Sequence, residues 1–222
     1  MNVPILYEDN HLLFVEKPVN VPVQEDQSKD QDLLNFLKKD IKVRYQKPGN
    51  VYLALVHRLD RPVGGVMVFS KTSKAASRLS DAIRRQAVEK KYLAVVRGIP
   101  DKKQALLKDY LVKDEQENKV YTTHANNKNA KKAKLEYEVL GSKKNLSLLS
   151  IKLHTGRPHQ IRVQFSSRNL PLYGDQKYGE KWNKTGEQIA LWSETLAIEH
   201  PTKKEEIKVE SRPPNQFPWN LW

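Results

Sequence analysis

The residues best suited to chemistry form one short polar run, His57-Arg58-Leu59-Asp60-Arg61, which directly follows the apolar run 52–56. A polar loop between buried strands is where a rigid scaffold presents functional groups. Asp60 lies between two arginines, whose charges should keep its carboxylate ionised at neutral pH. An ionised carboxylate on a loop can act as a nucleophile or a base. The alternative is a loop salt bridge without a catalytic role.

A second polar cluster, residues 154–162, is predicted to join a strand to a helix. Pro158 suits a first helical turn, and the free N–H groups at a helix start attract anions such as phosphate. Arg157 stands at that start. Arg162, about one turn further along, either faces solvent or points inward; an inward guanidinium needs an anionic partner, for which Asp60 is a candidate.

Metal chemistry and most cofactor chemistry find little support. The histidines at positions 154 and 159 do not share a helix face and have no evident third ligand, so we expect no metal. Glycine-rich phosphate loops and serine nucleophile elbows are absent. The chain has no cysteine, which excludes disulfides, thiolate metal sites and a cysteine nucleophile.

Tyr92 opens another apolar run, residues 92–96, after two lysines. It is either a core aromatic residue or a platform on which an unpaired base stacks. The dipeptide that precedes it does not separate the two interpretations.

The elements that must position these clusters are short strands with few helices between them, which indicates an α+β fold. The apolar alternation predicts a strand-turn-strand unit over residues 5–15 and further strands over 52–56, 66–69, 92–96, 135–140, 146–153 and 189–198. Helices are predicted over 32–45, over 73–86 and from Pro158 to about residue 168.

Length and charge limit the classes of protein that need considering. The 222 residues fit a single domain, 1–222, with a polar excursion or loose hairpin at 101–134 and a proline-rich tail at 200–222 that packs on the body. The formal net charge of +13 favours a polyanionic partner, nucleic acid before an anionic membrane surface. A merely soluble basic protein is the alternative. With no membrane span and no signal peptide evident, we expect a cytoplasmic protein that does not bind membranes.

Taken together, the clusters resemble the RluA-type family of RNA pseudouridine synthases. The resemblance rests on five segments in the family's order: the opening hairpin with Glu16-Lys17-Pro18, then 55–71 (LVHRLDRPVGGVMVFSK), 91–98 (KYLAVVRG), 155–163 (TGRPHQIRV) and 172–179 (LYGDQKYG). It implies the pseudouridine synthase fold, a mixed and mostly antiparallel sheet flanked by helices and loops, with a central active-site cleft. It also implies isomerisation of uridine in ribosomal or transfer RNA, without a cofactor.

The resemblance implies the following roles. Asp60 matches the catalytic aspartate, Tyr92 the tyrosine that stacks on the target uracil, and Arg162 the basic residue that pairs with that aspartate. Ile161 matches the apolar wall of the uracil pocket. The remaining predicted RNA-binding residues are His57, Arg58, Arg61 and Arg157.

Two departures from the family's pattern lie beside these residues. Pro62-Val63-Gly64 stands where Asp-Thr-Ser is common, and Gln164 stands where a histidine is common. Both bear on substrate choice more than on the reaction. Many relatives carry a small RNA-binding domain before the catalytic part; here the opening hairpin begins at residue 3, so we expect the catalytic domain itself, as a monomer, to select the RNA.

Two rival functions remain. A basic RNA-binding or assembly protein could keep the fold without catalysis, although the intact set of Asp60, Tyr92 and Arg162 argues against it. A glycosidase that uses Asp60 is a weaker alternative, because no second acidic residue is convincingly placed.

Overall fold

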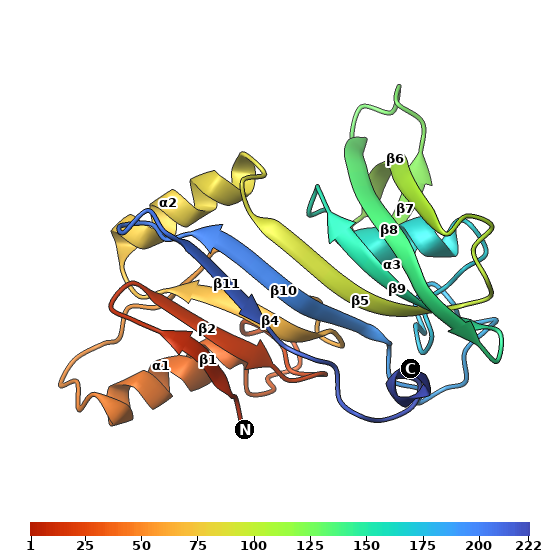
Figure 1. Ribbon diagram of the computed structural model, residues 1–222. Coiled ribbons are helices and arrows are strands. Elements are labelled where there is room, and N and C mark those ends of the chain that lie inside the picture. Colours follow the sequence, from red (N-terminus) through yellow and green to blue (C-terminus); the bar gives the residue numbers. More distant parts are fainter. The chain divides into compact units, whose positions relative to one another are not determined.

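The computed structural model describes residues 1–222, which form two compact units (Figure 1). The first unit comprises Met1–Glu89 together with Ser193–Arg212, and the second comprises Lys90–Trp192 together with Pro213–Trp222. The chain therefore leaves the first unit, builds the second and returns. Both units contain antiparallel strands together with helices, and the predicted α+β class is confirmed.

The first unit is built on the predicted hairpin of β1 (Ile5–Glu8) and β2 (Leu12–Lys17). β2 pairs antiparallel with β4 (Gly64–Ser70), which is followed in the sheet by β10 (Leu191–Glu199) and then by β11 (Glu206–Glu210). β3 (Ala54–Leu55) pairs with the last two residues of β4.

The predicted strand over 52–56 is wrong in its extent. Only Ala54 and Leu55 are paired, and both are half-buried. Its neighbour β4 has only its end left to pair on that side, because β10 already lies beside the start of β4, where the Ser193 hydroxyl donates to the Val66 carbonyl. The short β3 therefore opens early into the polar loop that carries Asp60.

Two helices flank this sheet (Figure 1). α1 (Leu33–Arg44) and α2 (Ser73–Arg84) begin close to the predicted residues, because the side chains of Asp32 and Thr72 accept the N–H groups of Asn35 and Ala75 as N-caps. Strands β2 and β4 are buried on both faces, which explains their nearly continuous apolar sequence. One face packs with α2, β10 and β11 in a cluster that contains the following residues: Leu12, Phe14, Val66, Val68, Leu79, Leu196, Ile198, Ile207 and Val209.

The second unit is an antiparallel sheet in the order β5-β9-β8-β6-β7. Its strands are β5 (Glu89–Arg97), β6 (Gln104–Asp114), β7 (Lys119–Thr123), β8 (Lys131–Lys143) and β9 (Leu146–Leu153). The helix α3 (Gln160–Ser166) packs on one face through Val163, which contacts Leu111, Val120 and Ala133. This packing fixes the segment that follows β9.

The segment 101–134 contains an antiparallel hairpin, one of the two predicted forms, and its strands are longer and more regular than predicted. It forms two complete strands, β6 and β7, and the start of β8. The buried residues Leu107, Leu111, Val120 and Ala133 alternate with exposed charged ones, and the charge excess masks this pattern in the sequence. We call these three strands the β6–β7–β8 arm.

The tail 200–222 also contains more structure than its prolines suggest. β11 lies within it, and the 3₁₀ turn Trp219–Leu221 follows. Trp219 and Trp222 pack against the cluster around Val95 and Tyr173 in the second unit.

Candidate active site

A buried lysine at the end of β2 holds the loop that carries Asp60. Lys17, at the end of β2, is fully buried, and its Nζ donates hydrogen bonds to the carbonyl oxygens of Pro18 (2.9 Å), Arg61 (2.9 Å) and Val63 (2.8 Å). Burial lowers the pKa of Lys17 to about 7, an effect that the nearby carboxylate of Asp60 opposes. Two of the three carbonyls belong to Arg61 and Val63, which follow Asp60 closely in sequence, so Lys17 fixes the loop that presents it.

Asp60 is half-buried, and its carbonyl accepts the N–H of Val63 (3.0 Å), which closes a tight turn. Arg58 is exposed. His57 is half-buried, and its Nε2 accepts the backbone N–H of Val68 in β4 (3.1 Å). That acceptor role leaves the proton of neutral His57 on Nδ1.

Arg61 is engaged by an acidic loop, residues 24–30. Its Nε donates to the Asn20 carbonyl (3.2 Å), one terminal nitrogen donates to the Ser28 hydroxyl (3.0 Å), and the other pairs closely with Asp30. Asp26 lies 3.6 Å away. The hydrogen bond from Arg61 lowers the pKa of Asp30, and hydrogen bonds from Ser28 lower that of Asp26. The guanidinium of Arg61, which we predicted to bind RNA phosphate, is thus paired with the carboxylates of Asp26 and Asp30.

Tyr92 lies in β5, opposite Ile151 of β9, and is only 8% exposed. Lys90, two residues earlier, has its pKa lowered by burial. A half-buried lysine beside a largely buried tyrosine gives this end of β5 a mixed apolar and cationic character.

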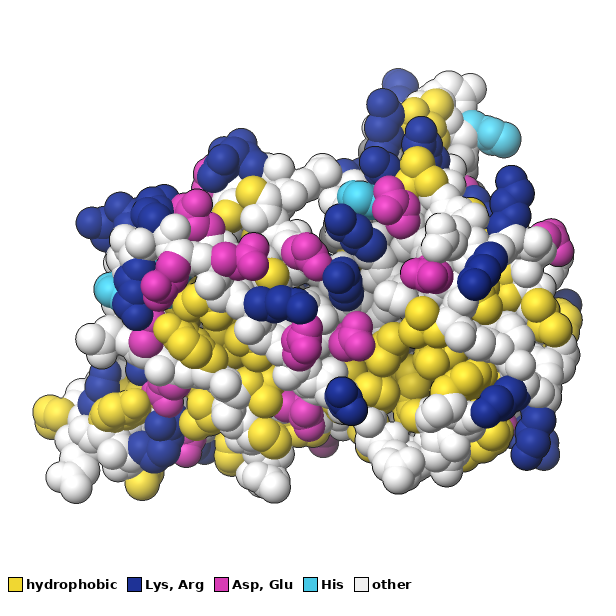
Figure 2. All heavy atoms as spheres, viewed as in Figure 1, with side chains coloured by type: hydrophobic (Ala, Val, Ile, Leu, Met, Phe, Trp, Pro, Cys, Tyr) yellow, Lys and Arg dark blue, Asp and Glu magenta, His cyan; other side chains and the backbone are white.

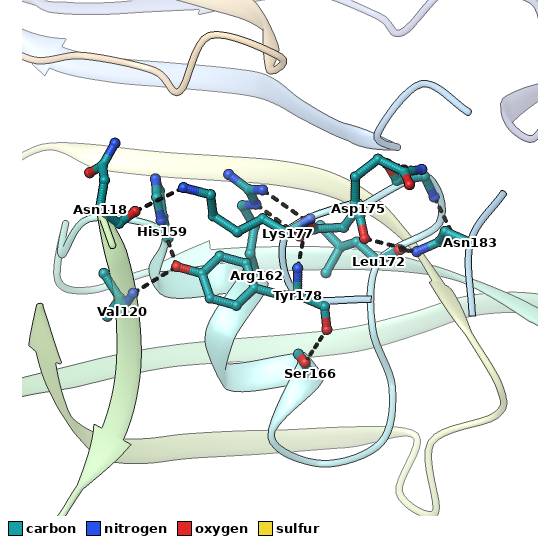
Figure 3. A network of polar contacts seen from close by, with 12 residues as sticks. Asn118, Val120, His159, Arg162, Ser166, Leu172, Asp175, Lys177, Tyr178 and Asn183 are labelled. Atoms are coloured by element: carbon teal, nitrogen blue, oxygen red, sulfur yellow. Dashed lines mark hydrogen bonds and ion pairs between the residues drawn. The ribbon is translucent and has the colours of Figure 1, made fainter. Parts of the chain in front are cut away.

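Arg162 points inward, in agreement with one of the two predicted interpretations, and has an unforeseen partner (Figure 3). Its Nε and one terminal nitrogen each lie 2.8 Å from an oxygen of Asp175, a bidentate pair that is buried on both sides. Asp175 also accepts the backbone N–H groups of Lys177 (3.0 Å) and Tyr178 (3.1 Å). The guanidinium lies 5.1 Å from the Tyr178 ring centroid, so its orientation is closely fixed.

The loop before α3 departs from the predicted helix start. The helix begins at Gln160, and His159 has a left-handed backbone (φ 51°), because the chain turns sharply after Pro158 before it becomes helical. The His159 ring lies 2.6 Å from the Tyr178 hydroxyl, which accepts the Val120 N–H (2.9 Å) (Figure 3). Ile161 is buried.

Each unit contains half of the predicted residues. The first holds His57, Arg58, Asp60 and Arg61, and the second holds Tyr92, Arg157, Ile161 and Arg162. Lys17 and Asp175 were not among the predicted site residues. A signal existed for both: Lys17 continues the buried alternation of Leu13 and Val15, and Asp175 lies in one of the segments that carry the resemblance.

No group of three or more His, Asp or Glu side chains is arranged to hold a metal ion. No helix of the chain combines the length and the apolar composition that a membrane span requires.

Comparison with known proteins decides the family. The sequence model of the RNA pseudouridylate synthase family matches residues 11–167. The chain belongs to this family. As a pseudouridine synthase it is an isomerase that acts on RNA, and the predicted resemblance is confirmed.

Among its relatives, an uncharacterised RNA pseudouridine synthase of Aquifex aeolicus is 33% identical over 97% of this chain and 72% of its own. The ribosomal large subunit pseudouridine synthase C of Buchnera aphidicola is 32% identical over 94% of this chain and 66% of its own. The solved structure of human RNA pseudouridylate synthase domain containing 4 is similar in fold, with a TM-score of 0.81 and 24% identity over 98% of this chain and 91% of that one.

Proposed function

We propose that this pseudouridine synthase modifies uridine in ribosomal RNA of the large subunit and that Asp60 is its essential carboxylate. The assignment of Asp60 rests on how firmly its loop is held. The half-buried carboxylate lies in a tight turn, and the buried ammonium group of Lys17 donates hydrogen bonds to carbonyls of that turn. Catalytic groups need such fixed positions. The proposed RNA follows the name of the Buchnera relative.

The reaction is an isomerisation in which every atom is retained. The bond between C1′ of the ribose and N1 of uracil breaks, the base turns, and a bond forms between C1′ and C5. The proton on C5 is lost and N1 gains one. In this proposal Asp60 either attacks the sugar or removes a sugar proton. The proposed reaction uses no cofactor and no metal.

The other predicted residues take the following roles in this proposal. Tyr92 stacks on the uracil, Ile161 forms an apolar wall, and Arg162 offsets the charge that changes on the carboxylate. The bidentate contact of Arg162 with Asp175 supports its role, because a fixed guanidinium needs no reorganisation during the reaction. His57, Arg58, Arg61 and Arg157 are the proposed contacts to the nucleotide and its phosphates.

The outer face of the β6–β7–β8 arm supports binding of a polyanion. Lys108 and Lys134 lie directly opposite each other in the β6–β8 register, and Lys132 lies opposite Tyr110. None of these three lysines forms an ion pair, and like charges placed opposite each other destabilise a sheet. Figure 2 shows dark blue side chains gathered at the arm. An RNA backbone would relieve this repulsion, and binding should weaken steeply with salt.

The test compares the wild type with Asp60→Ala and Asp60→Asn. We expect tritium release from RNA that contains 5-tritiated uridine to fall by about a thousandfold or more in both variants, while RNA binding persists. Asp81→Asn, an exposed aspartate of α2, is the matched control and should keep full activity. Release by Asp60→Ala at the wild-type rate would disprove the assignment, and an inactive wild type that binds RNA would favour the non-catalytic alternative.

The proposed RNA needs a separate test. Pseudouridine mapping across all cellular RNA, with and without this gene, should show a missing site in ribosomal RNA of the large subunit. A missing site in transfer RNA alone would keep the activity and replace the substrate. A cytoplasmic location and a monomeric state remain part of the proposal.

A further inference from the structure

Two buried glutamine side chains form a chain of hydrogen bonds that ends on the loop before α3. Gln160 and Gln164 are 3% and 0% exposed and lie one turn apart. Gln164 Nε2 donates to Asp109 of β6 (2.6 Å), and Gln160 Nε2 donates to Gln164 Oε1 (3.0 Å). Gln160 Oε1 then accepts both the Thr155 hydroxyl (2.7 Å) and the Arg157 backbone N–H (3.1 Å).

We call this chain of hydrogen bonds, from Asp109 through Gln164 and Gln160 to the Arg157 loop, the relay. The carboxylate of Asp109 sets its direction. Asp109 forms an ion pair with Arg168 (3.0 Å) and, when ionised, only accepts hydrogen bonds. The NH2 group of Gln164 must therefore face Asp109, which turns its oxygen toward Gln160. The NH2 group of Gln160 must face that oxygen and the Lys134 carbonyl (3.2 Å), to which it also donates, and this turns its own oxygen toward the loop. Flipping either amide would place two acceptors or two donors against each other in a buried site.

The chain of hydrogen bonds ends at the Arg157 loop, where the Nε of the guanidinium has an acceptor and its two terminal nitrogens do not. The Arg157 backbone is fixed by Gln160, and its Nε donates to the Lys132 carbonyl of β8 (2.9 Å). The two terminal nitrogens of this half-buried side chain have no protein acceptor. Two parallel N–H donors in one plane match the two oxygens of a phosphate.

We propose that Gln164 is a positioning residue for RNA binding: anchored on Asp109, it orients Gln160, which sets the Arg157 loop so that the guanidinium meets a backbone phosphate. This inference rests on the proposed function, since it assumes RNA as the ligand. It assigns a role to Gln164, which departs from the family's pattern, and to Asp109, which lies in the arm.

The decisive variant is Gln164→Leu, which keeps the buried volume and removes the relay. The probe is a transcript of large-subunit ribosomal RNA. We expect the dissociation constant to rise about two- to tenfold, the range that a lost buried hydrogen bond gives, with the single-turnover rate at saturating enzyme unchanged. Hydrogen exchange at the Arg157 backbone amide should accelerate in the free protein, because its acceptor is no longer held.

Ser147→Ala is the matched control. Ser147 is also fully buried in this unit and bonds the Gly98 carbonyl (2.8 Å), but it has no link to the Arg157 loop. It should lower stability without changing the dissociation constant or the exchange of Arg157. An equal rise in the dissociation constant for both variants would reduce the role of Gln164 to general stability and overturn the proposal.

Gln164→His provides a rescue that a structural role would not predict. A neutral imidazole has one donor and one acceptor and can carry the relay, whereas the protonated ring has two donors and cannot accept from Gln160. We expect wild-type affinity at pH 8 and the affinity of Gln164→Leu at pH 6. Unchanged binding by Gln164→Leu would disprove the inference even if the enzyme is active. An inactive wild type would instead disprove the proposed function, and binding and exchange would still decide the relay.

Discussion

The Nζ atom of Lys17 lies among three carbonyl oxygens, two of which belong to the loop that carries Asp60. A lysine ammonium group has three protons to donate, so the geometry uses each of them. The side chain reaches this position from β2, whose apolar residues lie in the core. The candidate catalytic loop is thus fixed to the sheet by one side chain that itself has no solvent contact.

Replacing this lysine should affect activity more than its distance from the substrate suggests. In Lys17→Met the apolar stem stays while three buried carbonyls lose their donor, and the Asp60 loop loses its fixed position. We expect kcat to fall by about tenfold or more, measured by tritium release. An unchanged kcat would show that the loop holds its shape without Lys17.

The same variant should change the pH dependence of stability. Burial lowers the pKa of Lys17 from its ordinary value of 10.5 to about 7, so between these values the unfolded chain binds more protons than the folded one. The free energy of unfolding should therefore rise with pH across that window in the wild type. Urea unfolding at pH 7 and pH 9 should show a larger rise for the wild type than for Lys17→Met.

Sequence reasoning at this scale works where a residue type is tied to its local run. Asp60 and Arg162 stand out because charges occur beside buried strands and apolar helix neighbours. Asp175 does not stand out as the partner of Arg162, because the contact joins residues 13 positions apart that only the turns after α3 bring together. Pairings of this kind depend on tertiary structure and leave little trace in the sequence.

Among the loops, the segment 24–30 combines acidity with contact to Arg61. Asp26 and Asp30 are exposed; Asp30 pairs directly with the guanidinium, and the Ser28 hydroxyl bridges Asp26 and the guanidinium. Carboxylates in this position compete with RNA phosphates for the same donors. The loop should therefore oppose RNA binding at Arg61 until it is displaced.

The double variant Asp26→Asn/Asp30→Asn tests this competition. We expect it to bind large-subunit ribosomal RNA about two- to tenfold more tightly, because Arg61 is released and two negative charges are removed. Asp40→Asn/Asp81→Asn makes the same charge change and also breaks exposed aspartate–arginine pairs, and it should have a smaller effect. Weaker binding by the first variant would identify the loop as a brace for Arg61.

Elements were predictable where periodicity and capping agree. α1 and α2 begin within one residue of the predicted ranges, where Asp32 and Thr72 cap them, and β4 follows its apolar run. The extent of the strands in the β6–β7–β8 arm was not predicted, because its buried face holds only small sets of apolar residues among many charges. α3 starts after its proline turn, since the left-handed His159 follows Pro158.

At the scale of the whole molecule, a largely buried histidine–aspartate pair is one of the contacts that join the two chain segments of the first unit. The fully buried His200, which follows β10, lies 2.8 Å from Asp9 in the β1–β2 turn. Asp9 also accepts the N–H groups of His11 (2.7 Å) and Leu12 (2.8 Å). Burial raises the pKa of Asp9, but these donors outweigh it and lower the value to about 2.

Asp9 should therefore make stability sensitive to acid. Its contribution of about 2 kcal/mol is complete above pH 3.8 and is lost as the pH falls toward 2, since the folded pKa lies below the unfolded one. We expect Asp9→Asn to lower the free energy of unfolding by about that amount at pH 7 and by much less near pH 2. Asp114→Asn, at the equivalent place in the β6–β7 turn, lacks a histidine partner and should cost less.

The return of residues 193–212 to the first unit has a consequence for synthesis on the ribosome. β2 and β4 are translated before the strands of the second unit, but β10 and β11, which complete their core, are translated after those strands. Until then Leu12, Phe14, Val66 and Val68 lack part of their packing, while the chain between can already fold. A stall or truncation before residue 193 would leave a nascent protein whose sheet exposes apolar side chains. This enzyme should therefore depend on chaperones during translation more than its modest length suggests.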